Sequence, residues 1–207
     1  MADAFSPYAG YDVLAKRDSP SWNEQTRAVI EQRLHAVPRR QFFSSDEWLT
    51  LEAVCERLLP QPERAAERVP IVQWIDLQLH EQPSEGFRYD DMPPRREAWR
   101  VGLAGIESES LLCYCAHFRD LPHDEQDEIL RAIQHGNVSS EPWHRLPPRR
   151  FFHHTLLRAV VAVYYAHPSA WSEIGFGGPA SPRGYARLGP NQRDPWEAEA
   201  RRNDAAR

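Results

Sequence analysis

The sequence is poor in the side chains that fill protein cores. Leu, Ile, Val and Phe together account for 43 of the 207 residues, which is close to the level below which chains fail to fold alone. Seven Trp and seven Tyr residues add apolar area, and both types are enriched at protein–protein interfaces. This composition is a first indication of a subunit that works with a partner.

Excess positive charge is also absent. The formal net charge is −5, so the protein has no general electrostatic attraction for nucleic acid or an anionic membrane. We therefore expect no nucleic-acid partner. The basic residues are 24 Arg and a single Lys, Lys16. One explanation of this excess of Arg over Lys is that guanidinium groups are better suited to desolvated ion pairs. The alternative is a GC-rich genome, which favours Arg codons.

The N-terminus has no basic stretch followed by an apolar one, so no signal peptide of the usual kind is expected. The longest uncharged run of the most apolar segment is 159–166, far shorter than the roughly 20 residues that cross a bilayer. We therefore expect a soluble protein without a direct membrane span, in the cytoplasm. Periplasmic location by co-export with a signal-bearing partner is the alternative.

Helical periodicity dominates, and no segment alternates like a strand with hairpin turns. Ser44 and Glu47 form a capping-box pattern, and Gly136 stands where a helix would end. Gly102 and Gly105 either weaken their helix or allow close packing. The predicted helices cover residues 21–38, 44–60, a stretch from Pro70, 93–117, 122–135 and 149–166.

The last forty residues have a different composition. Five of the ten glycines and five of the eighteen prolines follow His167 within about thirty residues, so we expect regular structure to stop there. The predicted fold is all-α, with a single domain of about six helices and an extended irregular C-terminal arm. Its predicted parts are a polar leader (1–20), the helical domain (21–166) and the arm (167–207).

No pattern in the chain predicts an active site. The glycines of "GFGGPASPRG" follow a helix and precede prolines, whereas a phosphate loop lies between a strand and a helix start. Cys113 and Cys115 would point about 200° apart on a helix and cannot share one metal ion, so we expect them to be buried structural thiols. We predict no catalytic, cofactor-binding or metal-binding residue on this chain.

Three stretches nevertheless form a distinctive set. They are "FFSSDEWLTLEAVCERLLPQ", "VPIVQWIDLQL" and "YYAHPSAWSEIGFGGPASPRGYARLG". The last combines a Tyr-Tyr-x-His-Pro corner, a Trp three residues later, Glu-Ile-Gly-Phe-Gly-Gly-Pro and Pro-Arg-Gly-Tyr. From about Gln41 to Gly189, the sequence resembles the gluconate 2-dehydrogenase subunit 3 family.

The resemblance implies an accessory small subunit of a flavin-dependent dehydrogenase that oxidises sugars, sugar acids or other alcohols. In that family FAD resides on a large partner subunit of the glucose-methanol-choline oxidoreductase type, and some complexes add a cytochrome c subunit. Many members carry a twin-arginine export signal. Arg39 and Arg40 mimic one, but Asp46 and Glu47 follow instead of an apolar stretch.

The arm is where we expect partner binding. Its Gly residues would supply turns or close approach, its aromatics would anchor on a surface, and its Arg residues would pair with carboxylates or carbonyls. The alternative is an arm that packs on the protein's own helices, entirely or up to Gly178. The candidate partner-binding residues are His167, Trp171, Glu173, Phe176, Gly177, Gly178, Pro179, Arg183, Gly184, Tyr185 and Arg187.

Two other functions remain open at this stage. One is a stand-alone enzyme or ligand-binding protein whose pocket the C-terminal arm closes. The other is a helical interaction module without a redox partner.

Overall fold

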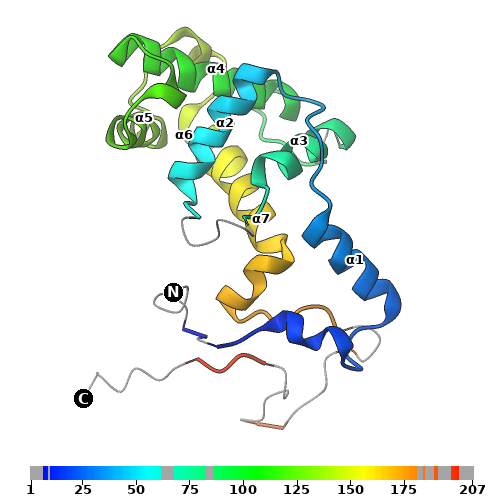
Figure 1. Cartoon of the computed structure of the whole chain (residues 1–207). Helices are drawn as coiled ribbons and strands as arrows, with labels where there is room; N and C mark the ends of the chain where they lie inside the picture. Colours follow the sequence, from blue (N-terminus) through cyan, green and yellow to red (C-terminus); the bar gives the residue numbers. More distant parts are fainter. Residues whose placement is uncertain are drawn as a thin grey trace, which may run out of the picture. The chain divides into compact units, whose positions relative to one another are not determined.

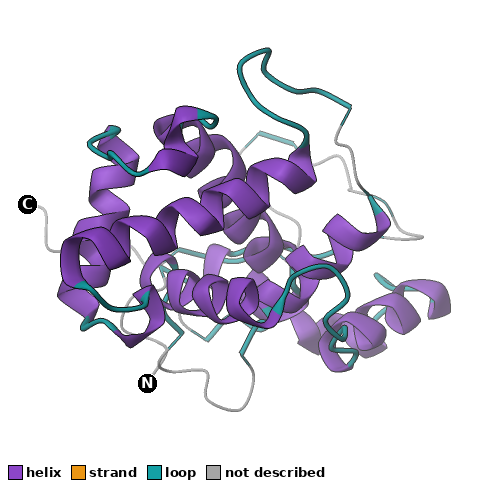
Figure 2. Cartoon of the chain, turned by 90° about the horizontal axis from the view of Figure 1, so that it is seen from above, coloured by secondary structure: helices purple, strands orange, loops and turns teal. Residues whose placement is uncertain are grey.

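The fold is all-α, as predicted. The computed structural model describes residues 7–8, 10–61, 68–82, 86–180, 184, 189–190 and 197–200. Every regular element in these ranges is a helix (Figures 1 and 2). The chain divides into two compact units, one of Met1–Val37, Glu63–Val69 and Tyr164–Arg207, the other of Pro38–Pro62 and Pro70–Val163. This division differs from the predicted one, because residues 21–37 group with the two chain ends rather than with the other helices.

The helices begin and end close to the predicted positions. The first unit contains a 3-10 helix, Val13–Asp18, then α1, Glu24–His35, and a 3-10 helix, Pro168–Ile174. The second contains α2 (Ser45–Leu58), α3 (Ile71–Glu81), α4 (Arg95–Tyr114), α5 (His123–His135), α6 (Pro148–Arg150), a π-helix (Phe151–Leu157) and most of α7 (Arg158–Ala166), with short 3-10 helices at Phe118–Asp120 and Glu141–His144.

Local capping signals were read correctly. The Ser44 hydroxyl accepts from the Glu47 amide at 3.2 Å, and the Glu47 carboxylate accepts from the Ser44 amide at 2.8 Å, so the predicted capping box is formed. Gly136 ends α5 with φ of +77°. These motifs need only neighbours in sequence, which is why they are visible without the tertiary structure.

Buried carboxylates hold the loops of the second unit. Asp76 of α3 is fully buried and accepts hydrogen bonds from the amides of Gln41, Phe42 and Phe43 at 2.6–3.0 Å. Glu109 of α4 is also buried and accepts from the Ser139 and Ser140 amides at 2.9 and 2.8 Å. Each carboxylate supplies acceptors for backbone N–H groups that an irregular segment cannot pair within itself.

The glycines of α4 serve close packing, which settles the choice that the sequence left open. A Cβ on Gly102 would lie 2.1 Å from Cζ of Phe151, and one on Gly105 would lie 2.5 Å from Cε2 of Trp143. Both aromatic rings are buried against the helix backbone. The helix therefore tolerates two residues of poor helix propensity because their missing side chains make room for rings.

A bidentate ion pair joins α2 to α5. Arg57 donates from Nε and Nη2 to the two carboxylate oxygens of Asp127 at 2.8 and 3.0 Å. The hydrogen bond from Arg57 is the main reason why the pKa of Asp127 lies below its usual value. This contribution to stability is complete above the unfolded pKa of about 3.9 and is lost as the pH falls through the lower folded value.

The substitution Gly102→Ala should destabilise the second unit by about 2 kcal/mol or more, because the new methyl group displaces the Phe151 ring. Helix propensity alone predicts the opposite sign, a gain of about 1 kcal/mol. Urea unfolding followed by circular dichroism measures the difference. Ala104→Gly, at an exposed position of the same helix, is the control and should cost only about 1 kcal/mol. A more stable Gly102→Ala variant would contradict the packing argument.

The Arg57→Gln variant should lose less stability than the wild type between about pH 5 and about pH 3, because it lacks the partner that lowers the pKa of Asp127. Melting temperatures at the two pH values measure the two slopes. Arg131→Gln is the control, since Arg131 lies farther from Asp127, at 3.5 Å, and is 64% exposed. Equal slopes in wild type and Arg57→Gln would refute a pH-dependent role for the pair.

Candidate partner-binding segment

The predicted partner-binding arm begins with a regular element, contrary to the expectation that structure stops at His167. Residues Pro168–Ile174 form a 3-10 helix with His167 as its N-cap. Pro168 stands at the first helical position, where its missing N–H is not needed. Gly175 then ends the helix with φ of +65°. Pro and Gly were expected to interrupt regular structure, but here Pro168 begins a short helix and Gly175 ends it.

His167 ties this 3-10 helix to α1. Its side chain is buried, with Nδ1 accepting from the Ser169 amide at 3.4 Å and Nε2 lying 3.0 Å from the Arg33 carbonyl oxygen. The two contacts assign the proton of the ring to Nε2, because a carbonyl can only accept. His167 is thus engaged within the first unit.

Trp171 belongs to a small apolar cluster with Val13, Trp22 and Ile30, all of them buried. The indole N–H of Trp22 donates to the carbonyl of Pro179 at 2.8 Å. In Figure 1 the N-terminal segment, in blue, runs alongside the C-terminal one, in orange. The leader that the sequence presented as merely polar therefore supplies the surface on which the arm packs. We call this arrangement, residues 8–22 with 167–179, the terminal clasp.

Backbone contacts continue the clasp as far as Pro179. Lys16, the chain's single lysine, is 4% exposed, and its Nζ donates to the carbonyl of Gly177. Gly178 has φ of +69°, and a Cβ there would lie 3.0 Å from Cγ2 of Val13. Only glycine combines that dihedral angle with so close an approach. Gly177 and Gly178 are therefore packed against the protein's own chain.

Polar side chains complete the attachment. The Tyr164 hydroxyl donates to both carboxylate oxygens of Glu173, at 3.1 and 2.9 Å. The Ser172 hydroxyl oxygen accepts from the Val13 amide at 3.1 Å. The 3-10 helix is thus held from α7 on one side and from the N-terminal segment on the other.

The part of the arm up to Gly178 follows the alternative in which it folds back on its own chain. Ile174 and Phe176 remain 44% and 40% exposed beside the buried Trp171, whose ring lies 5.4 Å from that of Phe176. Gly184 has φ of +71° with open space where a Cβ would be. Arg183, Tyr185 and Arg187 lie outside the described residues. Partner binding by any of these residues stays a prediction.

Cys113 and Cys115 are exposed, so the expectation of buried thiols was wrong. The buried face of α4 ends at Ser110, and Cys115 adopts a left-handed conformation at its C-cap, with φ of 54°. Cys55 is buried, and desolvation raises the pKa of its thiol. Tyr114 of α4 is half-buried, and its hydrogen bond to Glu128 raises the pKa of its hydroxyl to about 12.

Among the described residues, no group of three or more His, Cys, Asp and Glu is placed to hold a metal ion. None of the helices in the described part of the chain has both the length and the apolar character needed to cross a membrane.

The Trp22→Phe variant should speed amide exchange in residues 168–178 by about threefold to tenfold, because it removes the indole donor to Pro179 and with it about 1 kcal/mol. Hydrogen exchange followed by mass spectrometry measures this. Trp48→Phe is the matched control, since it removes an indole bond to Glu52 in the other unit. Unchanged exchange in Trp22→Phe would show that this bond does not hold the clasp.

Comparison with known proteins adds one match. Residues 45–178, more than half of the chain, match the family model described as gluconate 2-dehydrogenase subunit 3. No curated protein and no solved structure matches. The matched range begins at α2 and ends at Gly178, the last glycine of the clasp. The chain therefore belongs to the gluconate 2-dehydrogenase subunit 3 family.

Proposed function

We propose that the chain is a non-catalytic accessory subunit that stabilises or assembles a flavin-dependent dehydrogenase acting on sugars, sugar acids or alcohols. The large subunit of the complex carries FAD, and this chain carries no cofactor of its own. A cytochrome c subunit accepts the electrons in complexes that contain one. Membership of the gluconate 2-dehydrogenase subunit 3 family is the observation that carries the proposal.

The exposed edge of the terminal clasp is the surface that we assign to the partner. Ile174 and Phe176 expose apolar area within the glycine-rich motif, while Trp171 beside them is buried. Because each of the two side chains is already more than half buried, completing its burial in an interface contributes about 1 kcal/mol, less than half of what burial from full exposure gives.

The clasp also lowers the cost of binding. Its backbone is already held by Lys16, Trp22 and Ser172, so binding need not order a free chain, which costs about 1 to 2 kcal/mol for each residue. Ile174 and Phe176 can therefore serve as anchors without the cost of ordering the segment that carries them.

The double variant Ile174→Ser with Phe176→Ser should lower the yield of complex at least about tenfold, because it removes two anchors. The measurement is co-purification with the co-expressed flavin-bearing subunit, together with the flavin content of the product. Val29→Ser, on α1 and 51% exposed, is the matched control and should leave the yield unchanged. Hydrogen exchange of residues 168–178 verifies that the clasp itself survives in the variant.

Two results would contradict the proposal. One is a large subunit that, expressed alone, is as flavin-loaded, active and heat-stable as the complex. The other is isolated small subunit that binds flavin or turns over substrate without a partner. Localisation follows from the same experiment, because the N-terminus of the purified large subunit reveals any export signal; we place the complex in the cytoplasm unless that signal exports both chains.

A further inference from the structure

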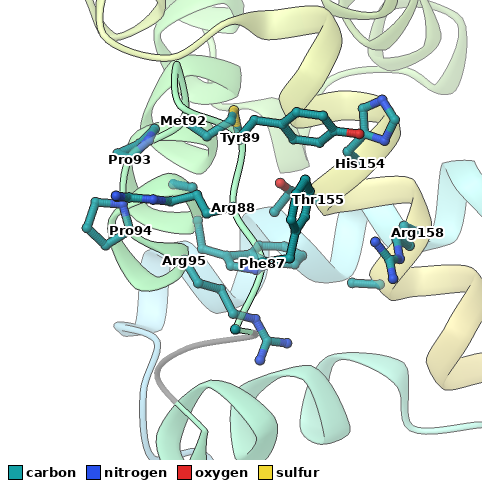
Figure 3. A pocket seen from close by; sticks show the side chains of 14 residues that line it. Phe87, Arg88, Tyr89, Met92, Pro93, Pro94, Arg95, His154, Thr155 and Arg158 are labelled. Atoms are coloured by element: carbon teal, nitrogen blue, oxygen red, sulfur yellow. The ribbon is translucent and has the colours of Figure 1, made fainter.

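The second unit contains a cavity that the proposed function does not use. Its volume is about 440 Å³, within the range of about 300 to 1,000 Å³ that small-molecule pockets occupy. Residues of the loop 86–94 and the start of α4 form one wall, and His154, Thr155 and Arg158 of the helix that continues into α7 form the opposite one (Figure 3). The described lining residues all lie between Gly86 and Ala159, outside the C-terminal arm.

Among the described residues, the lining is cationic and contains no carboxylate. Arg88, Arg95, Arg158 and His154 are its titratable basic residues. Arg95 is held in place by the Gln82 carbonyl at 3.2 Å, whereas Arg88 and Arg158 make no hydrogen bond or ion pair with any residue that the structure describes. Asp91, in the same loop, is outside the lining and pairs with Arg150 at 2.9 Å. The described part of the wall therefore carries an excess of positive charge, which favours an anionic ligand.

Two features of the backbone also favour a binding site at this cavity. Pro93 and Pro94 line the cavity at the N-terminus of α4, and Pro94 is an N-cap without a side-chain hydrogen bond. The positive end of this 20-residue helix dipole thus lies in the wall. His154 and Thr155 belong to a π-helical segment, an uncommon geometry that recurs at functional sites.

The remainder of the wall is flat and apolar. Phe87 is 72% exposed, although exposure of so large a ring to water is unfavourable unless something covers it. Tyr89 is fixed under the Arg150 guanidinium, 4.2 Å from its ring centroid. Met92 and Trp99 line the interior and are buried. A ligand that matches both the cationic and the apolar part of the lining needs an anionic group for the arginines and a flat apolar body for the rings.

We propose that this cavity binds a small organic carboxylate with a flat, apolar body. Arg158 binds the carboxylate through charge-assisted hydrogen bonds, and the ring of Phe87, which lies on the Arg158 side of the loop in Figure 3, covers the apolar body. The site is independent of the terminal clasp, because its described lining residues all belong to the second unit.

Titration of the full-length chain with benzoate and with benzamide tests the proposal, since the two probes share a shape and differ in charge. By isothermal calorimetry or by shifts of amide resonances, benzoate should bind at least about tenfold more tightly than benzamide. Arg158→Gln should weaken benzoate binding at least about threefold and leave benzamide unchanged. Arg145→Gln, an arginine of the same unit outside the lining and 63% exposed, is the matched control.

Equal affinities for benzoate and benzamide would overturn the proposal, and so would the absence of benzoate binding. Benzoate binding that survives the Arg158→Gln substitution would overturn the assignment of Arg158. Inorganic phosphate, titrated in parallel, should bind more weakly than benzoate, because it offers nothing to the rings; tighter binding of phosphate would point to a simple anion site instead. None of these results bears on co-purification with a dehydrogenase, so this inference and the proposed function fail separately.

Discussion

The structure depends on buried polar side chains that satisfy the backbone of irregular segments. Leu, Ile, Val and Phe supply only 43 of the 207 residues, and long loops join the helices. Asp76 and Glu109 bind five loop amides between them, and Lys16 and Trp22 bind two carbonyls of the arm. Since an unpaired buried backbone group costs about 1 to 3 kcal/mol, these few residues decide which loops are ordered.

This arrangement gives the C-terminal arm a double character. Its buried side chains, His167 and Trp171, attach it to α1 and to the N-terminal segment, and its half-exposed ones, Ile174 and Phe176, remain available to another molecule. A segment of Gly and Pro would otherwise lose much conformational entropy on binding. Attachment to its own chain removes most of that loss in advance, which suits a surface that must recognise one partner.

The sequence was most informative where structure depends on near neighbours. The capping box of Ser44 and Glu47, the helix end at Gly136 and the apolar face of α3 all depend on residues within one or two turns. The family motif was also readable, because residue types at fixed spacing persist without knowledge of the fold. The errors lay elsewhere. Cys113 and Cys115 were expected to be buried, yet both are exposed, because burial depends on what packs against a helix and not on residue type alone.

The sequence by itself determined an all-α chain, the approximate ends of its helices and the family to which it belongs, since periodicity, caps and motifs are local properties. Only the tertiary structure decided that Gly102 and Gly105 admit two aromatic rings, that Lys16 and Trp22 receive the arm, and that three arginines share one cavity. Each of these contacts joins residues far apart along the chain. No local pattern encodes such a pairing, because it is selected by the packing of the complete fold.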